Sequence, residues 1–341
     1  MPFVLHWGRP ATAMSTLPHL SPSPDLRERV VVTDVALRDG LQNQPEHVGT
    51  AGKAALMRAL AAAGVPSIEA ASFVSPRAVP QMADAAEVIA EALALAPLRA
   101  SALAPNLRGL ERAIAAGTRE VAVVLSCTET MNRKNINMSL AEATRVSCET
   151  LRAARTRGLA TRGYLAVAFE CPFEGTTPPE RVLELGLALL EAGADEIVVA
   201  DTIGAASPAQ VQQLLGRLLL QLPVDRLGLH LHDTRGMGVA NAYAGLELGV
   251  RRFDASAGGL GGCPFAPGAS GNVATEDLVL MLEQSGFATG ISLPGLAAAV
   301  DLAGELLGRP LGGHCMPWLR RQLARSAPAA PREAGREPAA G

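Results

Sequence analysis

Aromatic residues are scarce in this 341-residue sequence: they make up 3% of it, while Ala, Leu, Val and Gly dominate. A core without many large rings has to be filled by small aliphatic side chains, which suits helices packed against a parallel sheet. The length fits one large domain or two ordinary ones, and an α/β barrel typically takes about 250 residues as a single domain. The composition therefore favours a helix-and-sheet core of small aliphatic residues.

The sequence also lacks paired cysteines. Its five cysteines are odd in number, widely spaced and contain no C-x-x-C pair. This pattern argues against a disulfide framework and a structural zinc site and favours a reducing compartment, so we expect a cytoplasmic protein. The five are Cys127, Cys148, Cys171, Cys263 and Cys315.

Long apolar runs and an excess of one charge are missing as well. No apolar run reaches the roughly 18 residues that span a bilayer, and the net charge is −3. We therefore expect neither a membrane nor a nucleic acid as a partner. Residues 1–28, rich in Pro and Ser, are expected to be a flexible leader and not a signal peptide, with Met14 as a second candidate start. Residues 321–341, which end in a run rich in Pro, Ala and Gly, are expected to be a disordered tail.

Between these ends, over residues 29–320, short apolar runs alternate with longer amphipathic stretches. The expected strands are 30–35, 66–72, 98–104, 121–126, 163–169, 196–201, 227–232 and 252–257. The expected helices lie near 51–63, 82–95, 107–117, 139–157, 178–192, 207–220, 236–248 and 274–285. Eight strand–helix repeats predict an α/β fold, a (β/α)8 TIM barrel, with additional C-terminal helices over 291–320. A doubly wound sheet is the structural alternative.

Polar residues gather where the predicted strands end, which is where TIM barrels carry their chemistry. His230 and His232 stand two residues apart on one strand, so both imidazoles point to one face and can bind one metal. Asp39 follows the first strand. In a closed barrel, only the eighth strand lies between the first strand and the seventh, which carries the histidines. Asn272 adds an amide oxygen. Such a nitrogen and oxygen donor set suits Mg²⁺ or Mn²⁺. Two histidines that are merely hydrogen-bonded near a strand end are the alternative.

Two further features point to chemistry beside this metal site. Arg38 is suited to hold an oxygen that becomes negative during a reaction, and an ion pair with Glu69 or Asp201 is a structural role compatible with it. The run GGLGGCP at 258–264 has four glycines in five residues. A flexible loop that carries the Cys263 thiol suggests a gated acid or base, whereas a tight turn with an inert cysteine is the alternative.

Seven segments at these places form a pattern. They are RDGLQN from Arg38, SFVSPRAVPQMAD from Ser72, KNIN from Lys134, RGYLAVAFECPFEG from Arg162, DTIG from Asp201, HLHDT from His230 and GGLGGCPFAPGASGN from Gly258. Over residues 30–310 the sequence resembles the 3-hydroxy-3-methylglutaryl-CoA (HMG-CoA) lyase family. The Arg-Asp-Gly start and the His-x-His pair also occur in a wider superfamily of metal-dependent TIM-barrel lyases and synthases, whereas the GLGGCP, SFVSP and CPFEG segments are more specific to the lyases.

The resemblance implies a divalent-metal-dependent lyase that cleaves HMG-CoA into acetyl-CoA and acetoacetate by a retro-Claisen reaction, as in leucine degradation and ketone-body formation. It implies Mg²⁺ or Mn²⁺, an acyl-CoA partner and a homodimer. Arg38 would stabilise the enolate and Cys263 would deliver a proton, while the first base stays open between Asp201, His230 and Cys263. The implied metal ligands are Asp39, His230, His232 and Asn272. The implied catalytic residues are Arg38, Cys263, Asp201, Glu69 and His230, and the implied substrate contacts are Arg38, Gln42 and Asn135.

The sequence departs from the family pattern at a few positions around these groups. The family usually has Glu-Val-Gly-Pro before the Arg-Asp pair, where this chain has Asp-Val-Ala-Leu at 34–37. Gln44, Met138 and Gly258 stand where glutamate, cysteine and alanine are common. The catalytic groups remain, but the acyl chain stays open, and a related ester such as citramalyl-CoA is the alternative substrate. A Claisen-condensing synthase of the superfamily and a catalytically silent barrel used for binding are also compatible with the barrel fold.

Overall fold

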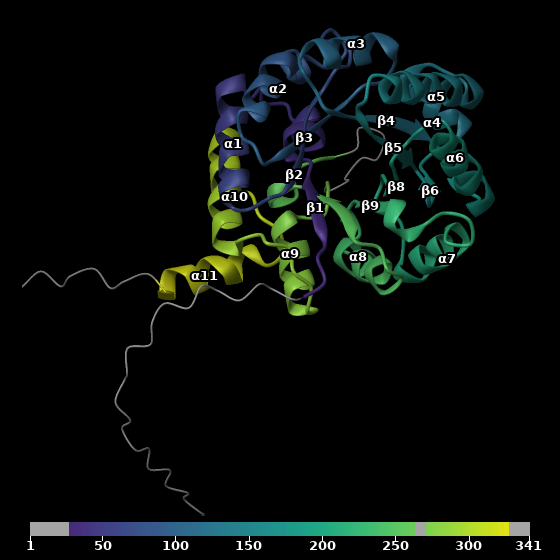
Figure 1. Cartoon of the computed structure of the whole chain (residues 1–341). Helices are drawn as coiled ribbons and strands as arrows, with labels where there is room; N and C mark the ends of the chain where they lie inside the picture. The colour runs from purple at the N-terminus through teal and green to yellow at the C-terminus, as the bar shows by residue number, and fades with distance from the viewer. Residues whose placement is uncertain (1–26, 263–270, 327–341) are drawn as a thin grey trace, which may run out of the picture.

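The computed structural model describes residues 27–262 and 271–326, and its centre is a closed barrel of parallel strands (Figure 1). The strands follow the order β1-β10-β9-β8-β5-β4-β3-β2, and β2 pairs with β1 to close the barrel. Their bounds are β1 Val31–Asp34, β2 Ser67–Ser72, β3 Arg99–Leu103, β4 Glu120–Ser126, β5 Ala160–Ala166, β8 Glu196–Asp201, β9 Leu227–Leu231 and β10 Arg252–Ala255. The predicted TIM barrel is confirmed, and the doubly wound sheet is excluded because the sheet closes on itself.

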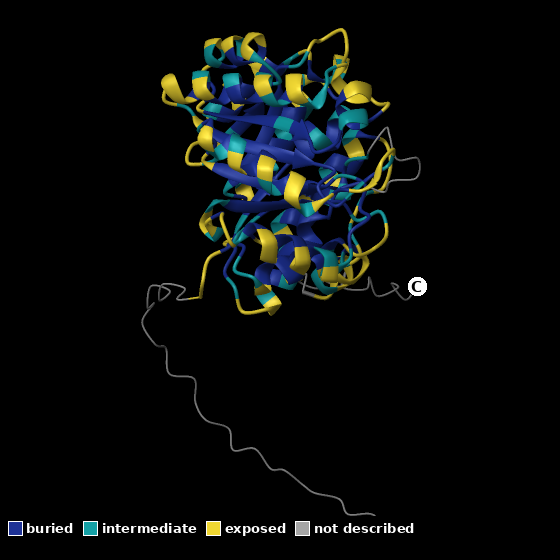
Figure 2. Ribbon diagram, turned by 90° about the vertical axis from the view of Figure 1, so that its right-hand side faces the viewer, coloured by how far each residue is buried: buried dark blue, intermediate teal, exposed yellow. Residues whose placement is uncertain are grey.

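The strands sit at the centre because most of them are covered on both faces. Every residue of β2, β8 and β9 is buried, so these strands pack against helices outside the barrel and against side chains inside it. Figure 2 shows buried ribbon at the centre and exposed residues on the outer helices. The short apolar runs of the sequence correspond to this double burial.

A ring of helices covers the outside of the barrel. Two of them begin with a capping box: Ser139 caps one with Glu142, and Ser207 caps another with Gln210. The helices that follow the strands are α1 Thr50–Ala62, α2 Ala85–Leu93, α3 Leu107–Ala115, α5 Leu140–Thr156, α6 Pro179–Glu191, α7 Pro208–Leu218, α8 Gly238–Glu247 and α9 Thr275–Gln284.

In the described part of the chain, two helices lie beyond the eighth repeat, as expected. They are α10 (Leu293–Leu306), which packs against α1, and α11 (Met316–Ser326). Helix α11 enters the segment 321–341 that the sequence predicts to be disordered, because its buried residues, such as Leu319, anchor it as one amphipathic unit. The rest of that tail, and residues 1–26 of the expected leader, lie outside the described residues.

Some short elements were not expected from the sequence. Helix α4 (Glu129–Ile136) precedes α5, and of its side chains only Met131 and Asn132 are buried, so it has little apolar periodicity to reveal it. A small hairpin, β6 (Glu170–Cys171) with β7 (Gly175–Thr176), lies outside the barrel sheet. Short helical turns η2 (Pro80–Met82), η3 (Val224–Arg226) and η4 (Ala257–Gly259) complete the described elements, together with η1 (Ala36–Gly40).

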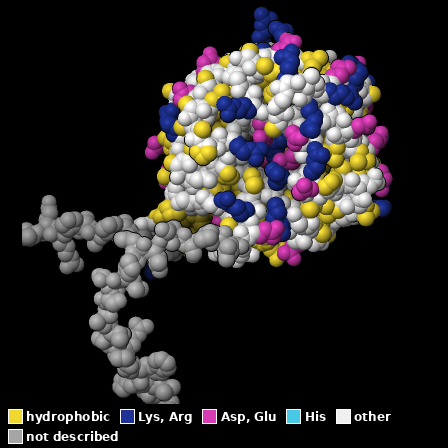
Figure 3. Space-filling view, viewed as in Figure 1, with side chains coloured by type: hydrophobic (Ala, Val, Ile, Leu, Met, Phe, Trp, Pro, Cys, Tyr) yellow, Lys and Arg dark blue, Asp and Glu magenta, His cyan; other side chains and the backbone are white. Residues whose placement is uncertain are grey.

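The outer surface is charged in both signs. Figure 3 shows Lys and Arg side chains mixed with Asp and Glu side chains around the centre of the face in view. Within the described ranges, the helices are too short or too polar to cross a membrane. Buried polar side chains such as Arg38 and His230 lie instead inside the barrel, where the carboxyl ends of its strands meet.

Candidate active site

Arg38 and Asp39 lie in the π-helical turn η1, directly after β1. The turn is held by Asp34, whose buried carboxylate accepts hydrogen bonds from the first N–H of the turn (2.9 Å) and from the Thr275 hydroxyl (2.7 Å). Within the turn, a Cβ added at Gly40 would lie only 3.0 Å from the Leu260 side chain, so a residue larger than glycine would be crowded there. Such π-helical turns are rare and occur often at functional sites. Here the turn presents a guanidinium and a carboxylate side by side.

His230, on β9, and His232, just after it, point their Nε2 atoms at each other across 3.2 Å. The Asp39 carboxylate lies 4.0 Å from His230 Nε2 and 3.8 Å from His232 Nε2. Burial lowers the pKa of His232 to about 4, so its imidazole is neutral and keeps a lone pair. Burial would raise the pKa of Asp39, but the Arg38 guanidinium and the two imidazoles lower it to about 2. One carboxylate and two imidazoles therefore meet as potential ligands.

Asn272 joins this cluster from the far end of the chain. Its Nδ2 donates to Asp39 Oδ2 (2.8 Å) and to the Leu260 carbonyl (2.9 Å). Its Oδ1, like Nδ1 of His232, is buried without a hydrogen-bond partner among the described residues. A buried acceptor left unpaired costs about 1–3 kcal/mol, and a bound cation would remove that cost. Because the ligand atoms of Asp39, His230 and His232 all lie within 4.8 Å of one another, these residues fit a divalent cation.

Arg38 is fixed from two sides. Its guanidinium contacts Glu69 Oε2 at 2.5 Å and Asp39 Oδ1 at 2.5 Å, so the ion pair with Glu69 that the sequence suggests is present. Burial raises the pKa of Glu69, and Arg38 opposes that rise. Burial alone would lower the pKa of Arg38, but Glu69 and Asp39 raise it well above its usual value. The guanidinium is therefore a permanent, oriented positive charge beside the candidate metal ligands.

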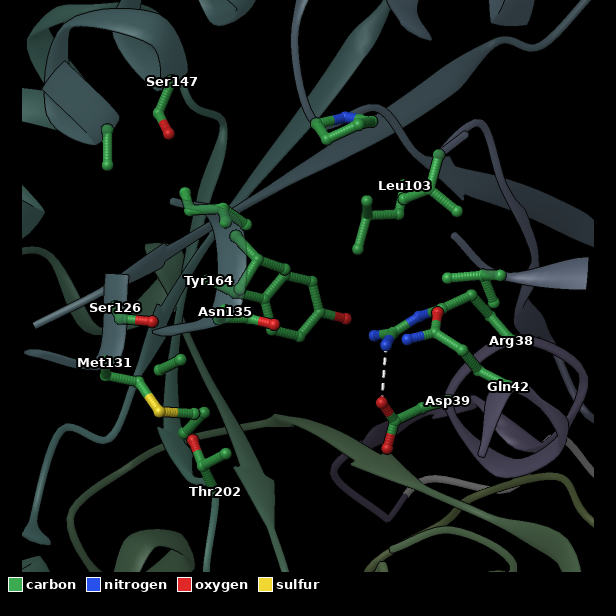
Figure 4. Close-up of a pocket in the computed structure, with 18 of the residues that line it drawn as sticks. Arg38, Asp39, Gln42, Leu103, Ser126, Met131, Asn135, Ser147, Tyr164 and Thr202 are labelled. Carbon is green, nitrogen blue, oxygen red and sulfur yellow. Dashed lines mark hydrogen bonds and ion pairs between the residues drawn. The ribbon is translucent and has the colours of Figure 1, made fainter. Parts of the chain in front are cut away.

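A cavity of about 420 Å³ opens beside these groups (Figure 4). Arg38, Asp39 and both histidines line one end of it, and Gln42 and Asn135, the expected substrate contacts, line it as well. Figure 4 shows the Tyr164 hydroxyl pointing toward Arg38. Away from the charged groups the cavity is lined mainly by apolar side chains together with three serines. These lining residues include Leu103, Met131, Ile136, Met138, Val146, Ser75, Ser126 and Ser147.

The HMGL-like family profile matches residues 29–302, which is most of the chain. The chain belongs to the HMGL-like family. It is 44% identical over 284 residues to hydroxymethylglutaryl-CoA lyase YngG of Bacillus subtilis (strain 168), covering 83% of this chain and 95% of that protein. It is also 44% identical over 294 residues to the (R)-citramalyl-CoA lyase of Chloroflexus aurantiacus, covering 83% and 93%. The family and the carbon–carbon lyase class expected from the sequence are confirmed.

Solved structures of HMG-CoA lyases match the fold of this HMGL-like chain closely. The Bacillus subtilis enzyme superposes with a TM-score of 0.83 at 42% identity, covering 88% of this chain and all of that one. A lyase from Acinetobacter baumannii, in complex with coenzyme A and 3-methylmalate, gives a TM-score of 0.80 at 38% identity, covering 91% and 98%. The barrel is therefore shared along nearly the whole length of these enzymes.

The structure does not bring Asp201 into the cavity of the HMGL-like barrel. Asp201 pairs in register with Leu231, whereas Ala200 pairs with His230, so the Asp201 side chain points away from the face that carries the histidines. Its two carboxylate oxygens accept hydrogen bonds from the backbone N–H groups of Ala205 (2.9 Å) and Ala206 (3.0 Å). This geometry assigns Asp201 to shaping the loop after β8 and argues against its expected part in catalysis.

Two other expected site features lie at the edge of the described residues. Cys263 falls outside them, so its position relative to the ligands stays a prediction. The glycine-rich run before it is held at Leu260 by Asn272 and at the Gly262 carbonyl by Asn43 Nδ2 (3.1 Å). Positive φ angles at 258, 259 and 261 explain why this run needs glycine.

A cluster of three buried polar side chains next to His230 was not predicted from the sequence. Arg162 and Tyr164, on β5, meet Asp254, on β10, inside the barrel. A signal for them is present in the sequence: Arg162 and Tyr164 stand two residues apart on one strand, and Asp254 lies between the apolar residues Phe253 and Ala255 on another. Alternation along the strands places all three on the inner face, but only the closed barrel shows that they touch.

Proposed function

We propose that this chain cleaves 3-hydroxy-3-methylglutaryl-CoA to acetyl-CoA and acetoacetate. The observation that carries the proposal is the convergence of Asp39, His230 and His232 beside the fixed guanidinium of Arg38, at the wall of one cavity. The similarity to hydroxymethylglutaryl-CoA lyases supports the substrate class, and the solved complex with coenzyme A supports an acyl-CoA ligand.

A divalent cation, Mg²⁺ or Mn²⁺, would be held by Asp39, His230, His232 and Asn272. It would supply Lewis-acid polarisation of substrate oxygens, which is what nitrogen and oxygen donors with open positions support. The donor set itself supports this proposal: within the part of the chain that the structure describes, the buried Asn272 Oδ1 has no hydrogen-bond partner, and His232 is neutral.

The protein side chains divide the remaining work. A base removes the proton of the C3 hydroxyl, the C2–C3 bond breaks, and its electron pair forms the acetyl-CoA enolate while C3 becomes the ketone of acetoacetate. Arg38 balances the charge on the thioester oxygen, because its guanidinium is always charged and faces the cavity. Cys263 delivers a proton to C2. Asp201 is committed to backbone amides, and the Nε2 lone pair of His230 would be used by the cation, so Cys263 remains as the first base among the candidates proposed from sequence.

The cavity supports an acyl-CoA but leaves citramalyl-CoA as a second candidate substrate. Its charged end, with Gln42 nearby, suits a hydroxyl and a distal carboxylate, and its apolar walls suit the uncharged part of a long thioester. The specific observation that favours citramalyl-CoA is the 44% identity to a citramalyl-CoA lyase, which equals the identity to the YngG lyase.

A substrate panel tests the function. The purified protein is incubated with HMG-CoA and with citramalyl-CoA, with Mg²⁺, with Mn²⁺ or with excess EDTA, and acetyl-CoA is measured. We expect the higher kcat/KM on HMG-CoA, no turnover in EDTA and recovery when the metal is restored. Higher kcat/KM on citramalyl-CoA selects the second substrate, and net condensation of acetyl-CoA with a keto acid selects a synthase. Full turnover with the metal confirmed absent overturns the metal-dependent mechanism.

The cellular setting is proposed with the same reaction. A lyase of this class would act as a homodimer in the cytoplasm, in leucine degradation and ketone-body formation. Sedimentation of the purified full chain measures the oligomeric state, and growth on leucine of a host that lacks its own lyase, with and without this chain, measures the metabolic role.

A further inference from the structure

The two candidate metal-binding histidines differ on the side of the ring that faces away from Asp39. His230 Nδ1 lies 3.2 Å from Asp254 Oδ2, a fully buried carboxylate oxygen. His232 Nδ1 is buried too, but it has no hydrogen-bond partner within the described part of the chain. One imidazole therefore has its second nitrogen held by the protein, and the other does not.

Asp254 is itself held by two donors from the other side of the barrel. Arg162 donates to its Oδ1 at 2.8 Å, and the Tyr164 hydroxyl donates to its Oδ2 at 2.6 Å. Arg162 also donates to the Tyr164 oxygen at 2.9 Å and to Glu196 at 2.9 Å. These residues come from β5, β8 and β10, and β5 is not a neighbour of β10, so the contacts run across the barrel interior.

The donors decide where the imidazole proton sits. Arg162 can only donate, and Tyr164, which accepts from Arg162, gives its own proton to Asp254. Both carboxylate oxygens of Asp254 are thus acceptors, so the hydrogen bond to His230 requires a proton on Nδ1. The other ring nitrogen, Nε2, then carries the lone pair, and Nε2 is the atom that faces His232 and Asp39.

We propose that Asp254, braced by Arg162 and Tyr164, is a positioning residue that holds His230 in its Nδ1–H form, with the Nε2 lone pair directed at the metal site. This inference rests on the proposed metal-dependent function. A hydrogen bond from a metal-ligating imidazole to a carboxylate fixes the ring and its tautomer, and losing such a partner typically costs about 10- to 100-fold in metal affinity. Among the described residues, His232 has no partner of this kind at Nδ1.

Asp254→Asn is the test variant, because it keeps the size and removes one acceptor oxygen. The asparagine oxygen is expected to stay with Arg162, which leaves its NH₂ group facing His230 and favours the Nε2–H form. We expect Mn²⁺ affinity, measured by calorimetry without substrate, to fall by about 10- to 100-fold. Glu196→Gln is the matched control: it removes a carboxylate from the same arginine without touching His230, and we expect Mn²⁺ affinity within about twofold of wild type.

A second measurement does not depend on the metal. The ¹⁵N shifts of the imidazoles in the metal-free protein, assigned by single substitutions among its six histidines, report which nitrogen carries the proton. We expect Nδ1–H for His230 in the wild type and in Glu196→Gln, and a shift toward Nε2–H in Asp254→Asn.

The outcomes separate the two proposals. An Nε2–H wild-type His230 overturns the positioning role even if the variant does not fold, and so does wild-type Mn²⁺ affinity in a folded Asp254→Asn. A wild type that shows Nδ1–H but binds no Mn²⁺ overturns the metal site of the proposed function and leaves the brace in place.

Discussion

Arg38 shows how one side chain can serve structure and chemistry together. Its guanidinium neutralises the buried Glu69 on one side and orients Asp39 on the other, at 2.5 Å in each case. A planar, permanently charged fork can make both contacts and still present its positive charge to the cavity. Because Glu69 has no exposed surface, removing Arg38 alone would leave a buried, unpaired carboxylate, which is strongly destabilising.

Replacing Arg38 therefore needs a compensated variant. In Arg38→Met combined with Glu69→Gln, the buried charge is removed together with the guanidinium, so we expect a folded protein. Loss of an oriented charge at a reacting oxygen typically costs a few kcal/mol, so kcat should fall by about a hundredfold or more while KM changes far less. Arg38→Lys, which keeps the charge but not the fork, should lie between. Steady-state kinetics decides, and a rise in KM alone would reassign Arg38 to ground-state binding.

Cys263 is expected to be the proton donor of the reaction. If its thiol delivers the proton to C2, Cys263→Ser should lower kcat by at least about a hundredfold, since proton transfer by a positioned group is worth about 10²–10⁴-fold. Folding and metal binding should stay normal. A thiol-alkylating reagent should inactivate the wild type, and a bound substrate analogue should protect it.

The remaining cysteines provide the controls for that experiment. Cys127, Cys148 and Cys171 are buried, and burial raises the pKa of Cys127 to about 12, so these thiols should react slowly. Single changes of these three or of Cys315 to Ser should leave kcat near the wild-type value. A fully active Cys263→Ser protein would make the glycine-rich run structural and move the proton donor elsewhere.

At the scale of elements, the first turn of α9 ties the C-terminal extension to the glycine-rich run. Glu276 accepts hydrogen bonds from the backbone N–H groups of Gly258 (3.1 Å) and Gly313 (2.7 Å). Its neighbour Asp277 accepts from the N–H groups of His314 and Cys315, both at 2.7 Å. The segment between α10 and α11 is therefore tied to the barrel, because Glu276 holds both this segment and the start of the glycine-rich run.

Glu276 makes this junction sensitive to pH. Burial raises its pKa to about 7, so between pH 4.5 and 7 the folded state binds more protons at this site than the unfolded state. Its contribution to the free energy of unfolding is fully present below pH 4.5 and is lost as pH rises through 7, by up to about 3 kcal/mol at about 1.4 kcal/mol per pKa unit. In urea unfolding, the advantage of wild type over Glu276→Gln should thus be larger at pH 5 than at pH 8.

The comparison between two pH values isolates the titration from the hydrogen bond that glutamine loses at every pH. Glu305→Gln, an exposed change on α10, should show the same small difference at both pH values. An equal advantage of wild type over Glu276→Gln at pH 5 and pH 8 would show that Glu276 titrates alike in the folded and unfolded chain.

For the whole molecule, the candidate metal site joins the two ends of the barrel sequence. Asp39 follows the first barrel strand, and Asn272, 233 residues later, follows the last one. The two histidines come from the strand that precedes the last one. A cation bound to all of them would bind the folded chain and not the unfolded one, so it should stabilise the entire barrel.

Thermal unfolding measures this linkage. At about 100 times its Kd, a ligand adds about 2.7 kcal/mol to the free energy of unfolding, which raises Tm by several degrees for a domain of this size. We expect Mn²⁺ or Mg²⁺ to raise Tm, EDTA to reverse the rise, and His232→Ala to abolish most of it. NaCl at matched ionic strength is the control. An identical rise in His232→Ala would place the cation elsewhere.

Whether a feature of the fold or of the candidate site could be predicted from the sequence depends on how far apart in the chain the interacting residues lie. The local periodicity of apolar residues indicates strands and helices, so the eight repeats and the C-terminal helices were predictable. The polar helix α4 was not, because it has little apolar periodicity. The cluster of candidate metal ligands was predictable because His230 and His232 lie two residues apart and strand order in a barrel places Asp39 nearby.

The barrel, its family and the types of residue at its mouth could therefore be predicted from the amino-acid sequence. Tertiary structure alone decided which side chains touch. Register turned Asp201 away from the cavity although it ends a strand beside the histidines, and closure of the sheet brought Arg162, Tyr164 and Asp254 together across the interior. The physical reason is that contacts between strands depend on register and closure, which no local stretch of sequence encodes.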